Sequence, residues 1–243
     1  MKFNKLMQLI KENARAEGPV SIRAEATANE VSIYINDVID GYFGANASAL
    51  IKELSAAGDK TVLMYINSPG GDVFEARAMA AAIAAHKGPI EAVITGVCAS
   101  AATYLALAAS KVRMVEGGLF MVHESWTLAY GNKGEFRQTA DLLEKIDSTI
   151  AASYAQKTNA SPEQIDAWMK AETWFTAQEA LDAGFIDAID SNTQNKTSNH
   201  WNLSAYANAP KQPEQKPEEP DLTAQVAQQL QLNRNRLRLL DQA

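Results

Sequence analysis

The chain has 243 residues and a formal net charge of −7 at pH 7, with 22 basic against 29 acidic residues. Hydrophobic residues make up 47% of the sequence and charged residues 21%, which is typical of a globular protein with one large core. The acidic balance argues against a nucleic-acid partner, and the single cysteine, Cys98, excludes an intrachain disulfide and a four-cysteine zinc site.

Hydropathy along the chain predicts a cytoplasmic protein that makes no membrane contact. The longest apolar stretches fall short of the roughly 18 residues that a membrane span needs. In the first residues, MKFNKLMQLIKEN, Lys11 and Glu12 interrupt the apolar run too early for a secretory signal.

Strands and helices are expected to alternate over the first half of the chain. A polar, partly helical lead-in covers residues 1–28. Strands are then expected at 30–35, 61–66 and 90–95, and helices at 47–57, 73–86 and 101–109. Asp72 and Glu75 have the spacing of a capping box at the start of the second helix.

The alternation continues to residue 190. Two short strands, KVRMV and LFMVH, flank Gly117-Gly118. They are followed by a long helix over 134–157, a shorter helix over 162–170, the segment 176–183 and a last strand, FIDAI, over 185–189. This order predicts an α/β architecture with crossover connections.

The composition changes after residue 190. Residues 191–243 hold four of the eight prolines and no glycine, which predicts a Pro/Gln-rich linker over 191–220. Residues 221–243 can form a helix with an apolar stripe. That helix is either a solvated tail or a docking element for a partner, because an isolated helix this short gains little without packing.

Two glycine-bearing turns, NSPGG (67–71) and GVCAS (96–100), each follow a buried strand and precede a helix. Main-chain N–H groups at such helix starts stabilise negative charge, so two neighbouring turns can hold one oxyanion. A phosphate site is disfavoured, because GxxxxGK[ST] is missing and Asp72 repels a phosphate.

Ser100, in the second turn, is the candidate nucleophile. Small neighbours such as Ala99 and Ala101 leave room for a substrate. The alternatives are that Ser100 is only an N-cap and that Cys98 is the nucleophile, although a lone cysteine at a strand exit is more often a small buried residue.

His123 is the candidate general base among three histidines. His86 ends a surface helix, and His200 lies in the polar tail. His123 ends a strand, which can aim its imidazole into a site; the alternative is a structural histidine. The adjacent Glu124 points to the opposite face of the strand, so an orienting acid must come from elsewhere.

Four motifs in this order resemble the ClpP peptidase family, which has the ClpP/crotonase fold. They are YINSPGGDV (65–73), GVCASAAT around Ser100, MVHE (121–124) and WFTAQEALDAGFIDAI (174–189). The resemblance covers roughly residues 30–190. It implies a spiral of ββα units with a protruding long helix, and a serine endopeptidase that needs no cofactor or metal.

The resemblance also assigns roles to single residues. Ser100 is the nucleophile, His123 is the base, and Gly71 and Ala101 supply the N–H groups of the oxyanion hole. The acid is where the chain departs from the family, which usually has Asp at the position of Glu172. The alternatives to Glu172 are Asp166 or a water molecule.

A second departure follows the histidine, where ESWTLAYGNKGEF (124–136) replaces a short Pro-containing stretch of the family. Trp126 and Tyr130 either line a substrate groove or pack under the long helix. The segments HESWT and ETWFT, together with the Pro/Gln-rich tail, are similar to the ClpP-related proteases of phages and prophages, which cleave capsid and scaffold proteins during head maturation.

The resemblance implies polypeptide substrates and homo-oligomeric rings, with the long helix in the place of the family's ring-to-ring handle. Docking of an AAA+ unfoldase stays open; no nucleotide motif exists in this chain, so any ATP use would belong to such a partner. The expected organisation is a lead-in (1–28), a peptidase domain (29–190), the linker (191–220) and a helical tail (221–243).

Three other functions stay open: a proteolytic subunit of an ATP-dependent Clp protease, a crotonase-like acyl-CoA enzyme and an inactive ring scaffold. No basic cluster for the phosphates of CoA is present.

Overall fold

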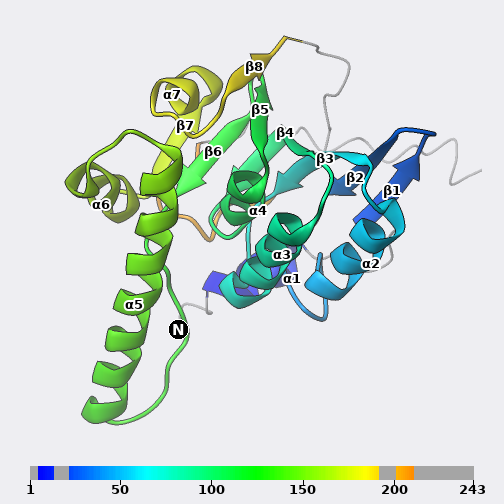
Figure 1. Ribbon diagram of the computed structural model, residues 1–243. Helices are drawn as coiled ribbons and strands as arrows, with labels where there is room; N and C mark the ends of the chain where they lie inside the picture. Colours follow the sequence, from blue (N-terminus) through cyan, green and yellow to red (C-terminus); the bar gives the residue numbers. More distant parts are fainter. Residues whose placement is uncertain (1–4, 14–21, 192–200, 211–243) are drawn as a thin grey trace, which may run out of the picture. The chain divides into compact units, whose positions relative to one another are not determined.

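A mixed sheet of eight strands forms the centre of the protein. The structure, a computed structural model, describes residues 5–13, 22–191 and 201–210. Six strands follow the order β1-β2-β3-β4-β5-β8, while β6 pairs with β4, and β7 pairs with β6 (Figure 1). The strands are β1 (Ile22–Ala26), β2 (Glu30–Ile35), β3 (Thr61–Ser68), β4 (Ile90–Ala99), β5 (Lys111–Val115), β6 (Leu119–Val122), β7 (Thr173–Thr176) and β8 (Ala188–Asp190).

Most neighbouring strands are parallel, with helices as crossovers; among the strands that the structure describes, only β1–β2 and β6–β7 are antiparallel. The helices are α1 (Lys5–Asn13), α2 (Ala47–Ala57), α3 (Val73–Ala85), α4 (Ala102–Ala108), α5 (Lys133–Lys157), α6 (Pro162–Lys170) and α7 (Ala177–Asp182). In Figure 1, α2, α3 and α4 lie side by side against the sheet, and α5 extends well beyond it. The α/β architecture expected from the sequence is confirmed.

Several boundaries differ from the expected ones, for reasons visible in the structure. The strand expected at 90–95 continues to Ala99 because its second half pairs with β6. The last strand begins at Ala188, since Phe185 and Ile186 turn into the core instead. Strands β1 and β7 were not anticipated, and both pair antiparallel at the margin of the sheet.

The expected capping box at α3 is only half formed. Asp72 accepts hydrogen bonds from the N–H groups of Phe74 and Glu75, as an N-cap should. The Glu75 carboxylate accepts a hydrogen bond from the N–H of Ala47, at the start of α2. Glu75 therefore joins two helices that pack together, instead of closing the box of its own helix.

Strand β4 has two partners along one edge, which shapes the site. Residues 91–94 pair with β5, whereas 97–99 pair with β6. The pairing of β3 with β4 also shifts register between Ile66 and Ser68. As a result the carboxyl ends of β3, β4 and β6 meet in one place, which is where catalytic groups collect in parallel sheets.

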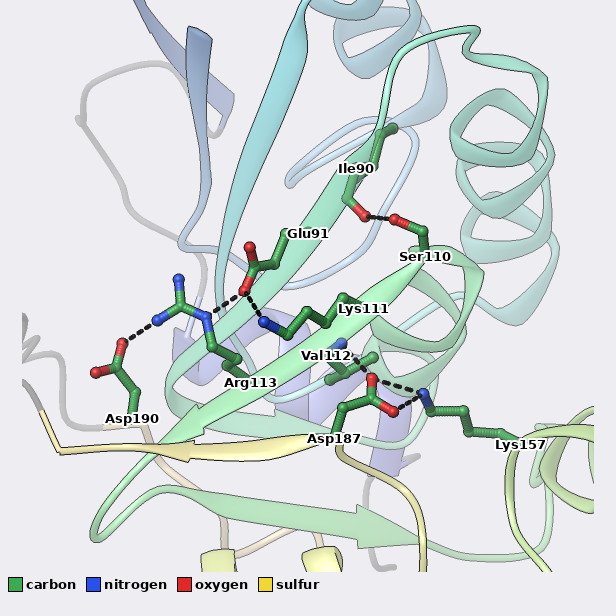
Figure 2. A network of polar contacts seen from close by, with 9 residues as sticks. All are labelled: Ile90, Glu91, Ser110, Lys111, Val112, Arg113, Lys157, Asp187 and Asp190. Atoms are coloured by element: carbon green, nitrogen blue, oxygen red, sulfur yellow. Dashed lines mark hydrogen bonds and ion pairs between the residues drawn. The ribbon is translucent and has the colours of Figure 1, made fainter.

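A network of charges joins the central sheet to its far edge (Figure 2). Arg113 on β5 contacts Glu91 on β4 and Asp190 on β8. Asp187 accepts hydrogen bonds from the N–H of Val112 at 2.7 Å and from the Lys157 ammonium at 2.8 Å. The network thereby holds β8 and the end of α5 against β5.

Residues 201–209, assigned to the linker by composition, pack against the folded domain. Trp201, Leu203 and Tyr206 are buried beside Val97 and Met121. The apolar side chains in this short stretch provide the contacts that the surrounding Pro/Gln-rich composition does not suggest.

The predicted tail helix (221–243) and most of the predicted linker lie outside the described residues. Within the parts of the chain that the structure describes, every helix is too short or too polar to cross a membrane.

Candidate active site

Ser100 lies at the sharp turn between β4 and α4. Its φ of 55° is unusual for a residue with a Cβ. The turn is held because Ser100 N–H donates to the Met121 carbonyl at 2.9 Å and Thr103 donates to the Ser100 carbonyl through its N–H and its hydroxyl. Strain of this kind at a strand-to-helix turn presents a hydroxyl to a site.

His123 follows β6, the strand that pairs with the end of β4. Its Nε2 lies 2.6 Å from the Ser100 Oγ, which is a hydrogen bond when this nitrogen is unprotonated. His123 is 9% exposed, and its imidazole is flanked by the rings of Trp126 and Tyr206. The structure therefore brings the predicted nucleophile and the predicted base into direct contact.

Gly70 and Gly71 form the neighbouring turn, after β3. Both have positive φ, at 90° and 150°. A Cβ on Gly70 would lie 2.8 Å from the Ser100 Cβ, and one on Gly71 would overlap the Ile39 carbonyl. Only glycine allows this turn to approach the nucleophile so closely.

Gly71 and Ala101 line one cavity together with Ser100 and His123. The cavity has a volume of about 180 Å³. Its remaining wall is largely apolar and comes from α3, α4, α5 and the segments around them; it includes Val73, Phe74, Tyr104, Leu142, Leu143, Ile146 and Ile150. A hydroxyl, an imidazole and two turns thus border an apolar recess.

The Glu172 carboxylate has two main-chain partners. It accepts hydrogen bonds from the N–H of Ala207 at 3.0 Å and of Asn208 at 2.6 Å. Glu172 itself has a φ of 48°. The residue predicted as the orienting acid is therefore bonded to the segment that carries Tyr206, and Tyr206 contacts His123.

The other candidates lie in different surroundings. Cys98 is completely buried in β4, and burial raises the pKa of its thiol strongly, so its thiolate is disfavoured. Asp166 forms an exposed ion pair with Lys170, and His86 ends α3 beside the Lys60 carbonyl. His200 lies outside the described residues.

Of the two aromatic residues after the histidine, Trp126 lines the cavity and contacts His123, as the groove interpretation predicts. Tyr130 is 82% exposed, so it neither lines this cavity nor packs under the long helix. His123 and Glu124 both follow the end of β6; His123 is buried and Glu124 is exposed, so the adjacent carboxylate lies in different surroundings from the imidazole.

Tyr206 is the site residue that sequence reasoning missed. It lines the cavity, and its ring meets His123 edge-on with 5.5 Å between ring centroids. No motif marks it, and the proline-rich composition around it obscures it. Among the described residues, no group of three or more His, Cys, Asp or Glu is arranged to hold a metal ion.

Comparisons with known proteins place the chain beside one family. The model of the Clp protease family matches residues 19–193. Similar proteins include the ATP-dependent Clp protease proteolytic subunits of Streptococcus pneumoniae strains Hungary19A-6, CGSP14 and R6. Each is 25% identical over 191 residues, which cover 76% of this chain and 96% of the relative. The match includes all five predicted site residues and ends before residues 201–209.

Proposed function

Because the chain belongs to the Clp protease family, a family of serine peptidases, we propose that it is a serine endopeptidase acting through Ser100 and His123. The observation that carries the proposal is the 2.6 Å contact between Ser100 Oγ and His123 Nε2, beside two glycine-shaped turns. A hydroxyl in contact with a base is the arrangement that nucleophilic catalysis requires.

The proposed reaction proceeds through an acyl-enzyme. His123 takes the Ser100 proton as the oxygen attacks the peptide carbonyl, and then returns that proton to the leaving amine. Water, activated by the same imidazole, releases the acyl group. The N–H groups of Gly71 and Ala101 hold the oxyanion of each tetrahedral intermediate, a contribution worth about 10²–10³ in kcat per donor in comparable enzymes.

The cavity beside Ser100 indicates which kind of substrate side chain the site binds. Its wall from α3 and α5 is apolar and includes Val73, Ile146 and Ile150. We propose that it receives an apolar side chain on the acyl side of the cleaved bond, because burying such a side chain is favourable and burying a charge there is costly.

Glu172 remains the residue proposed as the acidic member of the triad. Its carboxylate accepts the N–H groups of Ala207 and Asn208, and the acid of a triad serves to hold the histidine in its working orientation. Its contribution is measured by replacing the carboxylate with an amide of the same shape.

We propose that the protruding helix α5 takes part in assembly of the homo-oligomer. The side chains of Phe136 on α5, and of Leu128 and Tyr130 just before it, are large, mostly apolar and exposed. Apolar surface gathered on one element is typical of an interaction site. We propose that homo-oligomer contacts cover these side chains.

For the biological role we propose maturation of a phage or prophage head, with capsid or scaffold proteins as substrates, in the host cytoplasm or the procapsid. The segments HESWT and ETWFT and the tail after residue 190 support this role. The second candidate is a proteolytic subunit served by an AAA+ unfoldase, which the names of the Streptococcus pneumoniae relatives favour.

A fluorophosphonate probe tests the peptidase proposal directly. The purified full chain is labelled, the modified residue is mapped by mass spectrometry, and hydrolysis of casein and short peptides is measured alongside. Labelling of Ser100 together with hydrolysis supports the proposal. A chain that assembles but is neither labelled nor active contradicts it and favours the inactive scaffold.

A further inference from the structure

We propose that residues 201–209, here called the strap, complete the active site, and that Tyr206 is a positioning residue for His123. The strap lies beyond the family match, which ends at residue 193. The inference rests on the proposed peptidase function and adds a component to the same site.

The amino-terminal part of the strap is anchored in the domain. The Trp201 indole N–H donates to the Asn67 side-chain oxygen at 2.9 Å, and that oxygen also accepts the N–H of Val97 at 2.9 Å. Asn67 lies on β3 and Val97 on β4. One buried amide therefore ties the strap to the two strands whose ends carry the catalytic turns.

Helix α1 holds the strap from a second direction. Asn13 and Asn202 bond reciprocally: the Asn13 amide donates to the Asn202 carbonyl at 2.9 Å, and the Asn202 N–H donates to the Asn13 side-chain oxygen at 2.7 Å. Leu9 of the same helix is buried with Leu203 and also lines the cavity. The strap is thus held both by helix α1 and by strands β3 and β4.

Tyr206 then meets the catalytic histidine. Its hydroxyl donates to the Pro69 carbonyl, just before the two glycines of the first turn. Its ring stands at 79° to the His123 ring, and Trp126 and Trp174 flank it on other sides. Edge-on aromatic contacts of this kind favour one orientation of the rings.

Burial keeps the Tyr206 phenol neutral. Desolvation raises the pKa of this group well above its ordinary value, a hydrogen bond with Ser100 acts in the opposite direction, and the charge of Glu172 raises it again. A neutral hydroxyl remains a donor to Pro69 across the working pH range of a peptidase.

Glu172 holds the carboxyl-terminal end of the strap by hydrogen bonds. Its carboxylate accepts the N–H groups of Ala207 and Asn208, and the Asn208 amide donates to the Ala171 carbonyl at 2.7 Å. Charge-assisted hydrogen bonds of this type are the stronger ones. The acid therefore fixes the residues next to Tyr206, and through them it supports the imidazole.

The geometry favours a supporting strap over an inhibitory lid. Tyr206 borders the cavity, yet Ser100, Gly71 and Ala101 still line its open space. Trp201, Leu203, Ala205 and Tyr206 are each at most 5% exposed. The strap therefore belongs to the wall of the site, and its loss should weaken catalysis.

The test compares Tyr206→Ala, which removes the ring contact and the hydroxyl, with Tyr206→Phe, which removes only the hydroxyl. Since small misplacements of catalytic groups are costly, Tyr206→Ala should lower kcat by about tenfold or more with a smaller change in KM. The fluorophosphonate labelling rate of Ser100 should fall in parallel, and Tyr206→Phe should lie between the wild type and Tyr206→Ala. The matched control, Tyr42→Ala, alters a tyrosine that is 93% exposed and should keep wild-type rates.

A double-mutant cycle with Glu172→Gln tests the link through the strap. If Glu172 acts on His123 by way of Tyr206, the double variant with Tyr206→Phe should lose less than the product of the two single losses. The pH profile of kcat/KM should shift in both single variants, because it reports the base of the free enzyme. Should Tyr206→Ala not fold, this cycle still decides the question.

Each outcome has one meaning. Wild-type rates in both Tyr206 variants overturn the positioning role, and faster hydrolysis in either variant identifies the strap as an inhibitor. Losses that simply multiply in the cycle overturn the link through Glu172. A wild-type chain that is neither labelled nor active contradicts the peptidase itself, which separates that failure from failure of the strap proposal.

Discussion

The side-chain oxygen of Ser100 lies 2.6 Å from Nε2 of His123, although 23 residues separate them in the chain. The main chain sets this distance: the pairing of Ala99 with Met121 places the ends of β4 and β6 next to each other, and the Ser100 N–H bonds to the Met121 carbonyl. A nucleophile and a base that are positioned by sheet hydrogen bonds need little reorganisation before reaction.

Replacing Ser100 with alanine should abolish peptide hydrolysis by at least about 10³-fold, because the attacking oxygen is gone. Size-exclusion chromatography should show unchanged assembly. Cys98→Ala is the control and should keep activity, since the thiol is buried and protonated. Activity that survives Ser100→Ala and disappears in Cys98→Ala would move the nucleophile to the thiol.

Replacing Glu172 with glutamine should slow hydrolysis much more than it lowers the melting temperature. The amide removes the charge, and only one of its two polar atoms can still accept an N–H from residues 207–208. We expect a loss of at least about tenfold in kcat. Asp166→Asn is the control, because Asp166 forms only an exposed pair; silencing by that variant with little effect at Glu172 would show that the acid is misassigned.

Replacing Gly71 with alanine should remove most activity. The added Cβ would overlap the Ile39 carbonyl at a φ of 150°, so the turn must move away from Ile39 and leave its present position beside Ser100. A displaced oxyanion donor predicts a loss of about 10²–10³ in kcat. Gly117→Ala is a suitable control: its φ is also positive, at 86°, but its Cβ would meet open space. Equal activity in the two variants would contradict the role of the first turn.

Narrowing the apolar cavity should change substrate preference. Ile150 on α5 lines the cavity and is buried, so Ile150→Phe should lower kcat/KM by about tenfold for peptides with Leu before the cleaved bond. Peptides with Ala at the same position should lose less. A uniform loss for both peptides would mean that the cavity does not hold this side chain.

Replacing Asp187 with asparagine should destabilise the fold at neutral pH. Burial alone would raise the pKa of Asp187, but the hydrogen bonds from Lys157 and Val112 outweigh it and hold the pKa below its usual value. Its stabilising contribution is therefore full above the pKa of the unfolded chain and is lost as the pH falls through the folded-state pKa.

The size of this effect is limited because the Asp187 side chain is 39% exposed. We expect about 1 kcal/mol at pH 7, measured by urea unfolding. The difference between wild type and variant should shrink on acidification. A difference that grows at low pH would contradict the assignment.

Much of the fold follows from local patterns. Helices α2 and α6 have the expected bounds because Asn46 and Ser161 cap them and Gly58 ends the first. The strand FIDAI was displaced, because Phe185 and Ile186 are apolar enough for a strand but fill the core in a turn. Local propensity cannot distinguish these two uses of the same side chains.

The site was predictable only where a motif marks it. Ser100, His123, Gly71 and Ala101 lie in family motifs, and the structure gathers them around one cavity. Tyr206 reaches the same cavity through contacts with residues more than 80 positions away. Such contacts depend on tertiary packing, which no periodicity in residues 201–209 reveals.

Because β4 pairs with β5 along one part and with β6 along another, the two parts of the strand should tolerate different kinds of mutation. The segment 91–94 pairs with β5 and forms part of the general scaffold, whereas 97–99, together with the Ser100 N–H, joins the strand of the nucleophile to the strand of the base. Main-chain hydrogen bonds between strands do not depend on which apolar side chains surround them. Many substitutions elsewhere in the sequence can therefore accumulate without separating Ser100 from His123. Insertion or deletion of one residue between 95 and 99 would instead shift the register of β4 against β6, and this single change would separate Ser100 from His123.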